Sequence, residues 1–358
     1  MRLKISFLQS FLISVLLNKK CTDLFMKNKI YFAIPIIALA LIIAISFYRS
    51  RDKYIRTTLI ISDTILNITA QTSDKVMSKL TQDITNEINR IDNILNPYNV
   101  NSEIAKINKE SLGGETNIAV SDELAHIFET GLRYSKLSSS FDISIRPLIE
   151  LWGFGVKENQ TVPLKEDIDK ALSYIDYSAL SIITNDDGKK MLKLSKPLTF
   201  DFGSYGKGYI IEKLKDVFAK NNIKNYLIDY GGDTYANGIN SKGNPWVIAI
   251  RNPRNDADGY LGLLEATNCT IVTSGDYERY FTQDGTNYHH IIDAEIGYPT
   301  YNSISATIVH TNAEEADALS TTAFLMGTNF FTNEAFKYKE AYIVTPEGEL
   351  YIVTNENF

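Results

Sequence analysis

The sequence predicts a mixed α/β, or α+β, fold. Segments with the apolar spacing of amphipathic helices alternate with short β-branched runs bounded by Gly, Asn or Pro. No Pro/Ser-rich or charged linker interrupts residues 59–358, which predicts one continuous body rather than two separate domains. The composition, 44% hydrophobic and 22% charged, is that of a globular protein with a sizeable core.

Four helices are predicted from periodicity and caps. Apolar residues recur every three or four positions from Asp74 to Leu95, after the capping candidates at 72–74. A second helix begins at Asp122 behind Ser121. A third runs from about Gly206 to Asn221, and a fourth covers about Ala313 to Met326. The predicted strands are Tyr226–Tyr230, Trp246–Arg251, Thr270–Thr273, Ile304–His310, Ala341–Thr345 and Leu350–Val353.

The N-terminus carries an apolar run. Residues 30–48 contain no charge and are flanked by Lys and Arg, and they are just long enough to cross a bilayer core of about 30 Å. We predict a transmembrane anchor at 30–48 behind a basic leader at 1–29. The alternative is a cleaved signal peptide with a small-x-small site at Ala44-Ile45-Ser46. Met26 is a candidate true start, because a short basic stretch follows it.

Charge and cysteine content exclude several classes of protein. The 36 Lys and Arg against 43 Asp and Glu give a formal net charge of −7, which disfavours nucleic acid as a partner. The two cysteines, Cys21 and Cys269, have no CxxC spacing, which excludes a zinc ribbon or a disulfide-dense scaffold.

Three glycines precede the predicted third helix in the segment Asp201-Phe202-Gly203-Ser204-Tyr205-Gly206-Lys207-Gly208-Tyr209. Such a turn directs backbone N–H groups and a helix N-terminus toward an anion, and Lys207 adds a positive charge. An ordinary tight strand-to-helix connection explains the glycines equally well. Neither GxxxxGK[ST] nor GxGxxG is present.

Two further segments carry candidate chemistry. Asp317 and Thr321 are spaced i,i+4, so they project from one helical face, and both offer the hard oxygens that Mg²⁺ prefers. An acidic residue near a helix N-terminus also simply complements the helix dipole. His289 and His290 are two of the four histidines and follow a turn at Asp284-Gly285. They are either exposed hairpin residues or part of a functional site.

These segments, taken together and in order, resemble a known family. The matching residues are Phe141-Asp142 with Pro147-Leu148 and Leu151-Trp152-Gly153-Phe154-Gly155, Asp201-Phe202-Gly203 with Gly206-Lys207-Gly208-Tyr209, Gly231-Gly232-Asp233, Thr273-Ser274-Gly275-Asp276-Tyr277, His290-Ile291-Ile292-Asp293 with Gly297 and Pro299, and Ala316-Asp317-Ala318-Leu319-Ser320-Thr321. They resemble the FAD:protein FMN transferases (the ApbE family), formerly called thiamine-biosynthesis lipoproteins.

The resemblance implies a single two-lobed catalytic domain over residues 59–358. It implies an Mg²⁺-dependent enzyme at the cell membrane, with its catalytic domain extracytoplasmic. Such an enzyme transfers FMN from FAD to a Thr or Ser hydroxyl of an acceptor flavoprotein with an FMN-binding domain, forming a phosphoester and releasing AMP.

The resemblance also assigns roles to residues. It implies that Asp317, Thr321 and Ser204, through its side chain or its backbone, hold Mg²⁺. His290 is the candidate acceptor of the hydroxyl proton, with a pKa expected near the working pH, and Asp317 shares the catalytic assignment. His289 is expected to be a bystander. The residues expected to contact the flavin nucleotide are Phe141, Asp142, Asp201, Lys207, Tyr277 and Ile291.

Some positions depart from the family pattern. Ser62-Asp63-Thr64 stands where a flavin-contacting Met-Gly-Thr is usual, Ala294 replaces a Pro, and Tyr205 replaces a smaller residue. These departures leave hydrolysis of FAD to FMN and AMP open as an alternative to transfer. The dense aromatics and the glycine-rich turn are also compatible with a membrane-tethered flavin-binding protein without turnover. Ser204 and Lys207 also satisfy SxxK, but the SDN and KTG elements of a serine acyl-enzyme are missing.

Overall fold

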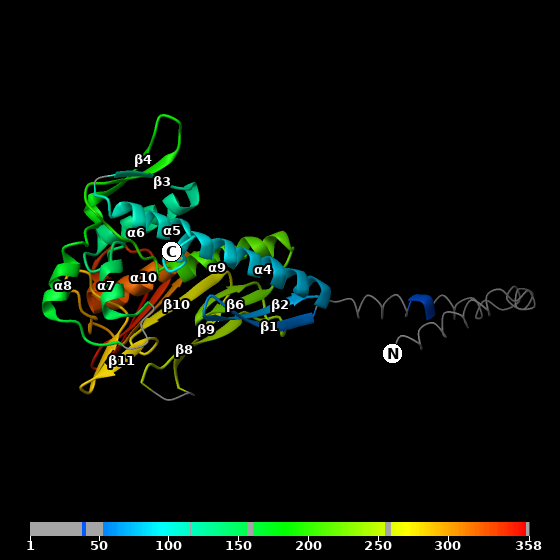
Figure 1. Cartoon of the computed structure of the whole chain (residues 1–358). Coiled ribbons are helices and arrows are strands. Elements are labelled where there is room, and N and C mark those ends of the chain that lie inside the picture. The colour runs from blue at the N-terminus through cyan, green and yellow to red at the C-terminus, as the bar shows by residue number, and fades with distance from the viewer. Residues whose placement is uncertain (1–37, 41–52, 115, 156–159, 255–258, 356–357) are drawn as a thin grey trace, which may run out of the picture. The chain divides into compact units, whose positions relative to one another are not determined.

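The computed structural model describes residues 38–40, 53–114, 116–155, 160–254, 259–355 and 358 (Figure 1). The chain divides into two compact units, Met1–Lys53 and Tyr54–Phe358. The predicted leader at 1–29, including Met26, lies outside the described residues. So does the predicted membrane segment at 30–48, except for residues 38–40, which are helical. In the described ranges, no helix is both long and apolar enough to cross a membrane.

An eight-stranded sheet forms the centre of the second unit, in the order β1-β2-β6-β7-β10-β13-β14-β15. From β2 to β15, neighbouring strands pair antiparallel. The strands are β1 (Lys53–Ile61), β2 (Thr64–Thr72), β6 (Tyr226–Tyr230), β7 (Asp233–Asn237), β10 (Cys269–Gly275), β13 (Ser305–His310), β14 (Glu340–Val344) and β15 (Leu350–Thr354).

Three smaller sheets complete the β-structure of the described residues: β3-β5-β4, the ribbon β8-β9 and the hairpin β11-β12. Their strands are β3 (Thr116–Ala119), β4 (Leu180–Thr184), β5 (Lys190–Leu194), β8 (Trp246–Arg251), β9 (Tyr260–Ala266), β11 (Tyr280–Gln283) and β12 (Thr286–His289). The mixed α/β fold predicted from the sequence is confirmed.

The α-helices of this unit are α4 (Asp74–Leu95), α5 (Glu103–Ser111), α6 (Asp122–Leu137), α7 (Arg146–Trp152), α8 (Lys165–Leu172), α9 (Gly206–Lys220) and α10 (Ala313–Met326). Short 3₁₀ segments cover Tyr177–Ala179 and Gly327–Thr332. Ser73 and Ser121 cap α4 and α6 as predicted, each accepting a bond from a backbone N–H three residues on.

The helices and the β8-β9 ribbon cover opposite faces of the large sheet. Residues that alternate along β2 and β6 pack with α4 and α9 into one apolar cluster. Ile271 and Val309 instead join Trp246 of β8 and Ala266 of β9 in a second cluster. Helix α10 lies against β10 and β13 and also contacts α9 (Figure 1). The turn before α9 and residues 320–321 of α10 are thereby brought next to the end of β10.

The predicted helices agree with the structure to within one residue. Four predicted strands differ slightly from the observed ones. β10 extends beyond Thr270–Thr273 to Cys269–Gly275, and β13 starts at Ser305 rather than Ile304. β14 covers Glu340–Val344 rather than Ala341–Thr345, and β15 ends at Thr354 rather than Val353. Boundaries of this kind depend on sheet pairing, which local sequence does not specify.

Candidate active site

The glycine-rich turn leads directly into α9, and α10 packs against its first turn. A Cβ added at Gly208 would lie 2.2 Å from the carbonyl oxygen of Ala313, so only glycine allows this approach of the two backbones. Tyr205 gives α9 no side-chain cap. Instead, the Oδ2 atom of Asp317 on α10 accepts a 2.8 Å hydrogen bond from the Gly208 N–H. Asp317 therefore caps the neighbouring helix and is fixed by it.

A group of oxygen atoms surrounds this contact. The Thr321 hydroxyl donates to the backbone carbonyl of Ser204 at 3.0 Å. The Ser274 Oγ atom, near the end of β10, lies 2.8 Å from Ser320 Oγ and 3.4 Å from Thr321 Oγ1. The structure thus brings together the turn and the helix that carry the three predicted metal ligands, Asp317, Thr321 and Ser204, and it directs the carbonyl of Ser204 toward Thr321.

The donor set fits a small hard cation. Asp317 supplies a carboxylate, Thr321 a hydroxyl and Ser204 a carbonyl, all of them oxygen ligands. Among the residues that the structure describes, no group of three or more His, Cys, Asp and Glu forms a metal site of protein ligands alone. Mg²⁺ typically takes only one or two protein carboxylates and completes its coordination with water and substrate phosphates. With one carboxylate, one hydroxyl and one carbonyl, the site has the composition of a Mg²⁺ site that water and substrate phosphates complete.

Lys207 links Asp317 to a second buried carboxylate. Its Nζ lies 2.7 Å from Oδ2 of Asp233 and 3.6 Å from Oδ1 of Asp317, and each carboxylate side chain is 3% exposed. Burial raises the pKa of Asp317 to about 7, against the opposing effect of the Lys207 charge. Burial lowers the pKa of Lys207, but the two carboxylates outweigh it and the net shift is upward.

Asp233 was not among the sequence-predicted site residues. The motif Gly231-Gly232-Asp233 was visible in the sequence, yet nothing local connects it to Lys207 on α9. Asp233 meets Lys207 only because β7 packs beside α9 in the folded chain.

His290 follows β12 and is anchored to the backbone of Arg279. Its Nδ1 lies 3.2 Å from the Arg279 carbonyl oxygen, which can only accept, so Nδ1 carries the proton and Nε2 presents its lone pair. Burial, assisted by the Arg279 charge, lowers the pKa of His290 to about 3. The predicted pKa of His290 near the working pH was wrong, because neither the burial of the ring nor the nearby Arg279 charge can be read from the sequence. The imidazole is neutral, which is the form that accepts a proton.

His289 has a structural position. It is 2% exposed, its Nε2 lies 2.6 Å from the carbonyl of Thr300, and its Nδ1 accepts from the N–H of Ile291 at 3.2 Å. Both ring nitrogens are therefore used, and the ring packs edge-on against Phe324. This residue joins β12 to the segment before β13.

Two residues predicted to contact the nucleotide lie in a buried turn after α6. The Oδ1 of Asp142 accepts from the N–H and the hydroxyl of Ser144, both at 2.7 Å, and Oδ2 accepts from the N–H of Tyr177 at 2.9 Å. Phe141, 3% exposed, packs against the rings of Tyr134 and Tyr205. Asp142 thus organises local backbone, and its contact with a nucleotide stays a prediction.

Asp201, Tyr277 and Ile291 are three further residues that are predicted to contact the nucleotide. Asp201 accepts a 2.8 Å bond from the N–H of Gly203, and burial raises its pKa. Tyr277, beyond the end of β10, lies under the guanidinium of Arg251, 4.9 Å from its ring centroid. Ile291 is buried beside His290. No contact in the structure tests their predicted role.

Arg146 is a further residue that the sequence did not single out. Its side chain is 11% exposed and pairs with Glu150 at 2.5 Å, and its guanidinium lies over the ring of Tyr98. Its Nη1 is buried without a hydrogen-bond partner among the described residues. Its charge lowers the pKa of Asp201, against the larger opposing effect of burial. An unpartnered buried donor of this kind is suited to an acceptor atom of a ligand.

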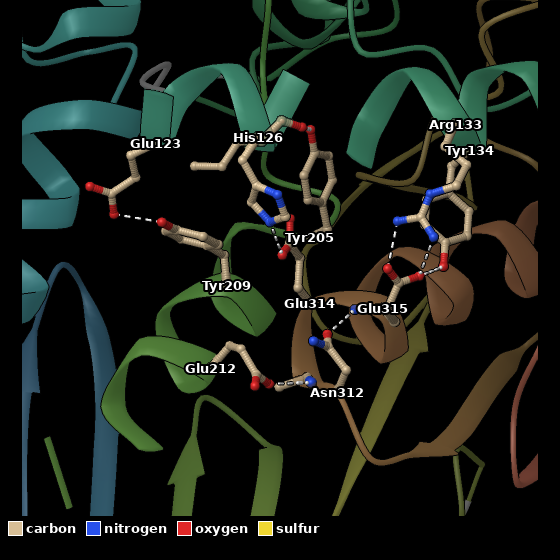
Figure 2. Close-up of polar contacts among 12 residues, drawn as sticks. Glu123, His126, Arg133, Tyr134, Tyr205, Tyr209, Glu212, Asn312, Glu314 and Glu315 are labelled. Atoms are coloured by element: carbon tan, nitrogen blue, oxygen red, sulfur yellow. Dashed lines mark hydrogen bonds and ion pairs between the residues drawn. The ribbon is translucent and has the colours of Figure 1, made fainter. Parts of the chain in front are cut away.

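Polar contacts from neighbouring helices fix the first turn of α10, as Figure 2 shows. Glu314 lies 3.0 Å from Nε2 of His126 on α6. Glu315 accepts bonds from Arg133, at 2.5 and 3.1 Å, and from the hydroxyl of Tyr134. On the α9 side, Glu212 accepts from the N–H of Ala313 at 2.9 Å. These contacts hold α10 about one turn before Asp317.

Two open grooves lie away from this chemistry. One, of about 500 Å³, is lined by residues of β1 and α4, and the other, of about 590 Å³, lies between α6 and β4. Neither is lined by any predicted site residue. The buried oxygens and the charged Lys207 mark the candidate site better than these grooves do.

Known proteins resemble this chain over most of its length. The sequence model of the ApbE family matches residues 62–340. The FAD:protein FMN transferase of Escherichia coli K12 is 30% identical over 287 residues, covering 79% of this chain and 78% of the relative. The protein of that name from Vibrio cholerae is 30% identical over 251 residues, covering 69% of this chain and 73% of the relative.

Two solved structures share the fold. The ApbE protein of Thermotoga maritima has a TM-score of 0.74 at 28% identity and covers 86% of this chain and 98% of its own. The flavinyl transferase ApbE of Pseudomonas stutzeri, in its apo form, has a TM-score of 0.73 at 26% identity and covers 86% and 96%. Because the family model matches most of the chain and relatives 30% identical align with more than two thirds of it, this chain belongs to the ApbE family.

Proposed function

We propose that the chain is an FAD:protein FMN transferase that moves the FMN half of FAD onto a Thr or Ser hydroxyl of an acceptor flavoprotein with an FMN-binding domain. The observation that carries this proposal is the convergence of Asp317, Thr321 and the Ser204 carbonyl at the start of α9, beside Lys207. Relatives that align over more than two thirds of the chain bear this activity in their names.

The reaction exchanges one phosphorus–oxygen bond for another. The acceptor hydroxyl oxygen bonds to the phosphorus of the FMN half, the bridging oxygen of the pyrophosphate leaves with AMP, and the hydroxyl proton must be removed. Such a transfer needs positioning and charge stabilisation more than covalent participation of the protein. Lys207 and the N-terminus of α9 supply positive charge for the pyrophosphate.

We further propose that the site binds Mg²⁺ through Asp317, Thr321 and the carbonyl of Ser204. When bound, the ion would offset charge on the phosphate oxygens. The buried Asp317 carboxylate would be a ligand of this ion, and the hydrogen bond from the Gly208 N–H keeps the carboxylate in place. Thr321 is oriented by its own bond to Ser204.

His290 is proposed to take the proton of the acceptor hydroxyl at Nε2. The support is its tautomer, since Nδ1 donates to the Arg279 carbonyl and leaves Nε2 free to accept. The Lys207 charge contributes to its lowered pKa, so the two groups lie within electrostatic reach of each other.

A direct assay separates this function from its alternatives. The full chain in detergent is incubated with FAD, Mg²⁺ and a flavoprotein acceptor domain. We expect covalent flavin fluorescence on the acceptor in a denaturing gel, with one AMP released per flavin attached and both lost on adding EDTA. AMP release that needs no acceptor would identify an FAD pyrophosphatase instead. FAD binding with neither product would indicate a flavin-binding protein without turnover.

We also propose that residues 30–48 tether the chain to the cell membrane, with the body on its outer side. The support is the uncharged run between basic flanks. In cell fractionation, the full chain is expected in the membrane fraction, and protease added to spheroplasts is expected to degrade the body. Protection from protease would place the body inside.

A further inference from the structure

We propose that Asp233 is a positioning residue that holds the Lys207 ammonium back from Asp317 and so keeps the Asp317 carboxylate able to bind a cation. The inference rests on the proposed function, because it concerns the same site. It assigns a task to Asp233, a buried carboxylate that is not itself one of the predicted metal ligands.

The three charged groups come from three elements. Lys207 lies in the first turn of α9, Asp317 lies on α10, and Asp233 is the first residue of β7. The turn between β6 and β7 consists of Gly231 and Gly232, with φ of 62° and 95°, a conformation that favours glycine. It places Asp233 opposite Tyr230 in the sheet. The carboxylate is therefore built into the sheet and cannot move far.

The distances show how Lys207 divides its charge. Its Nζ is 2.7 Å from Asp233 but 3.6 Å from Asp317, so Asp233 holds the closer ion pair. Apart from this ion pair, the Oδ2 of Asp233 has no hydrogen-bond partner among the described residues, and a backbone hydrogen bond from Thr273 also holds the carboxylate. The Oδ2 of Asp317, by contrast, accepts from Gly208.

The net charge of Asp233, Asp317 and Lys207 determines how strongly the site attracts a cation. Two carboxylates and one ammonium carry one net negative charge, which attracts a cation to a site of low dielectric. If Asp233 were neutral, Lys207 would pair with Asp317 alone and the net charge would be zero. Removing Lys207 together with Asp233 would restore the single negative charge. Glu278 also acts electrostatically on Lys207 and is unchanged in all of these cases.

The test is cation binding to the full chain in detergent at pH 8 without FAD, measured by calorimetry with Mg²⁺ and by the electron paramagnetic resonance of Mn²⁺. The variants are Asp233→Asn, Lys207→Met and the double variant. Glu129→Gln is the matched control, because it also neutralises an acid paired with a lysine, Lys190 at 3.1 Å, on the surface. Thermal unfolding of each variant reports folding.

We expect Asp233→Asn to weaken cation binding about tenfold or more, and Lys207→Met to strengthen it. The double variant should bind within about threefold of the wild type, as should the control. Recovery in the double variant is decisive, because a structural role of Asp233 would not be rescued by removing a second group.

Other outcomes overturn the inference. Unchanged affinity in Asp233→Asn, or a double variant as weak as Asp233→Asn, would show that Asp233 does not act through Lys207, while the proposed metal site would stand. A wild-type chain that binds neither cation, both in this titration and when it is repeated with FAD present, would overturn the metal assignment and this inference together.

Discussion

Replacement of Asp317 with Asn is expected to lower FMN transfer at least about 100-fold while leaving the stability of the fold close to that of the wild type. The amide oxygen of Asn can still accept the bond from the Gly208 N–H, so α9 keeps its cap. What is lost is the negative charge beside Lys207. The measurement is the rate of AMP release and of flavin attachment, with thermal unfolding on the same samples.

Asp317→Ala separates the two tasks of this residue. It removes the charge and also leaves the buried Gly208 N–H without a partner, which costs about 1–3 kcal/mol. We therefore expect the Ala variant to be as inactive as the Asn variant but to unfold at a lower temperature. The control is Asp122→Asn, an acid in the first turn of α6, which should affect neither quantity. A near-normal transfer rate in Asp317→Asn would contradict the assignment of this carboxylate to the metal site.

The fold was predictable where periodicity was strong. The apolar spacing and the Ser caps of α4 and α6 determined both helices correctly. The β1-β2 hairpin was missed, because its turn residues Ser62 and Asp63 adopt φ of 49° and 54° without any glycine to signal it. Its two strands also have weak local patterns. They become strands because β2 pairs with β6, more than 150 residues away.

The site was predictable only in part. The i,i+4 spacing placed Asp317 and Thr321 on one face, but their partners come from the turn before α9 and were supplied by resemblance to the family. The ion pair of Asp233 with Lys207 depends on tertiary packing. So does the low pKa of His290, which is set by burial and by Arg279. Sequence identifies such residues but not their charge environment.

His290→Ala is expected to lower the rate of transfer about 10²- to 10⁴-fold and to leave the affinity for FAD within about twofold. The reason is that Nε2 presents a lone pair, while nothing in the geometry makes the ring a nucleotide anchor. With a pKa of about 3, the imidazole stays neutral above pH 5, so the loss should be the same factor from pH 6 to 9. Weakened FAD binding in the variant would instead make His290 a ligand contact.

The pH dependence of stability gives an independent check with a definite sign. In the unfolded chain His290 titrates near its usual pKa of about 6.5, so the unfolded state binds a proton first as the pH falls. His290 therefore costs stability progressively between about pH 6.5 and pH 3, and the Ala variant should lose less stability over that range.

His126 is the matched control, because its bond to Glu314 raises its pKa. Its contribution is present below pH 6.5 and lost as the pH rises, so His126→Ala should lower stability at pH 6 but not at pH 9. Parallel unfolding profiles of the two variants would show that the burial of His290 does not depress its pKa.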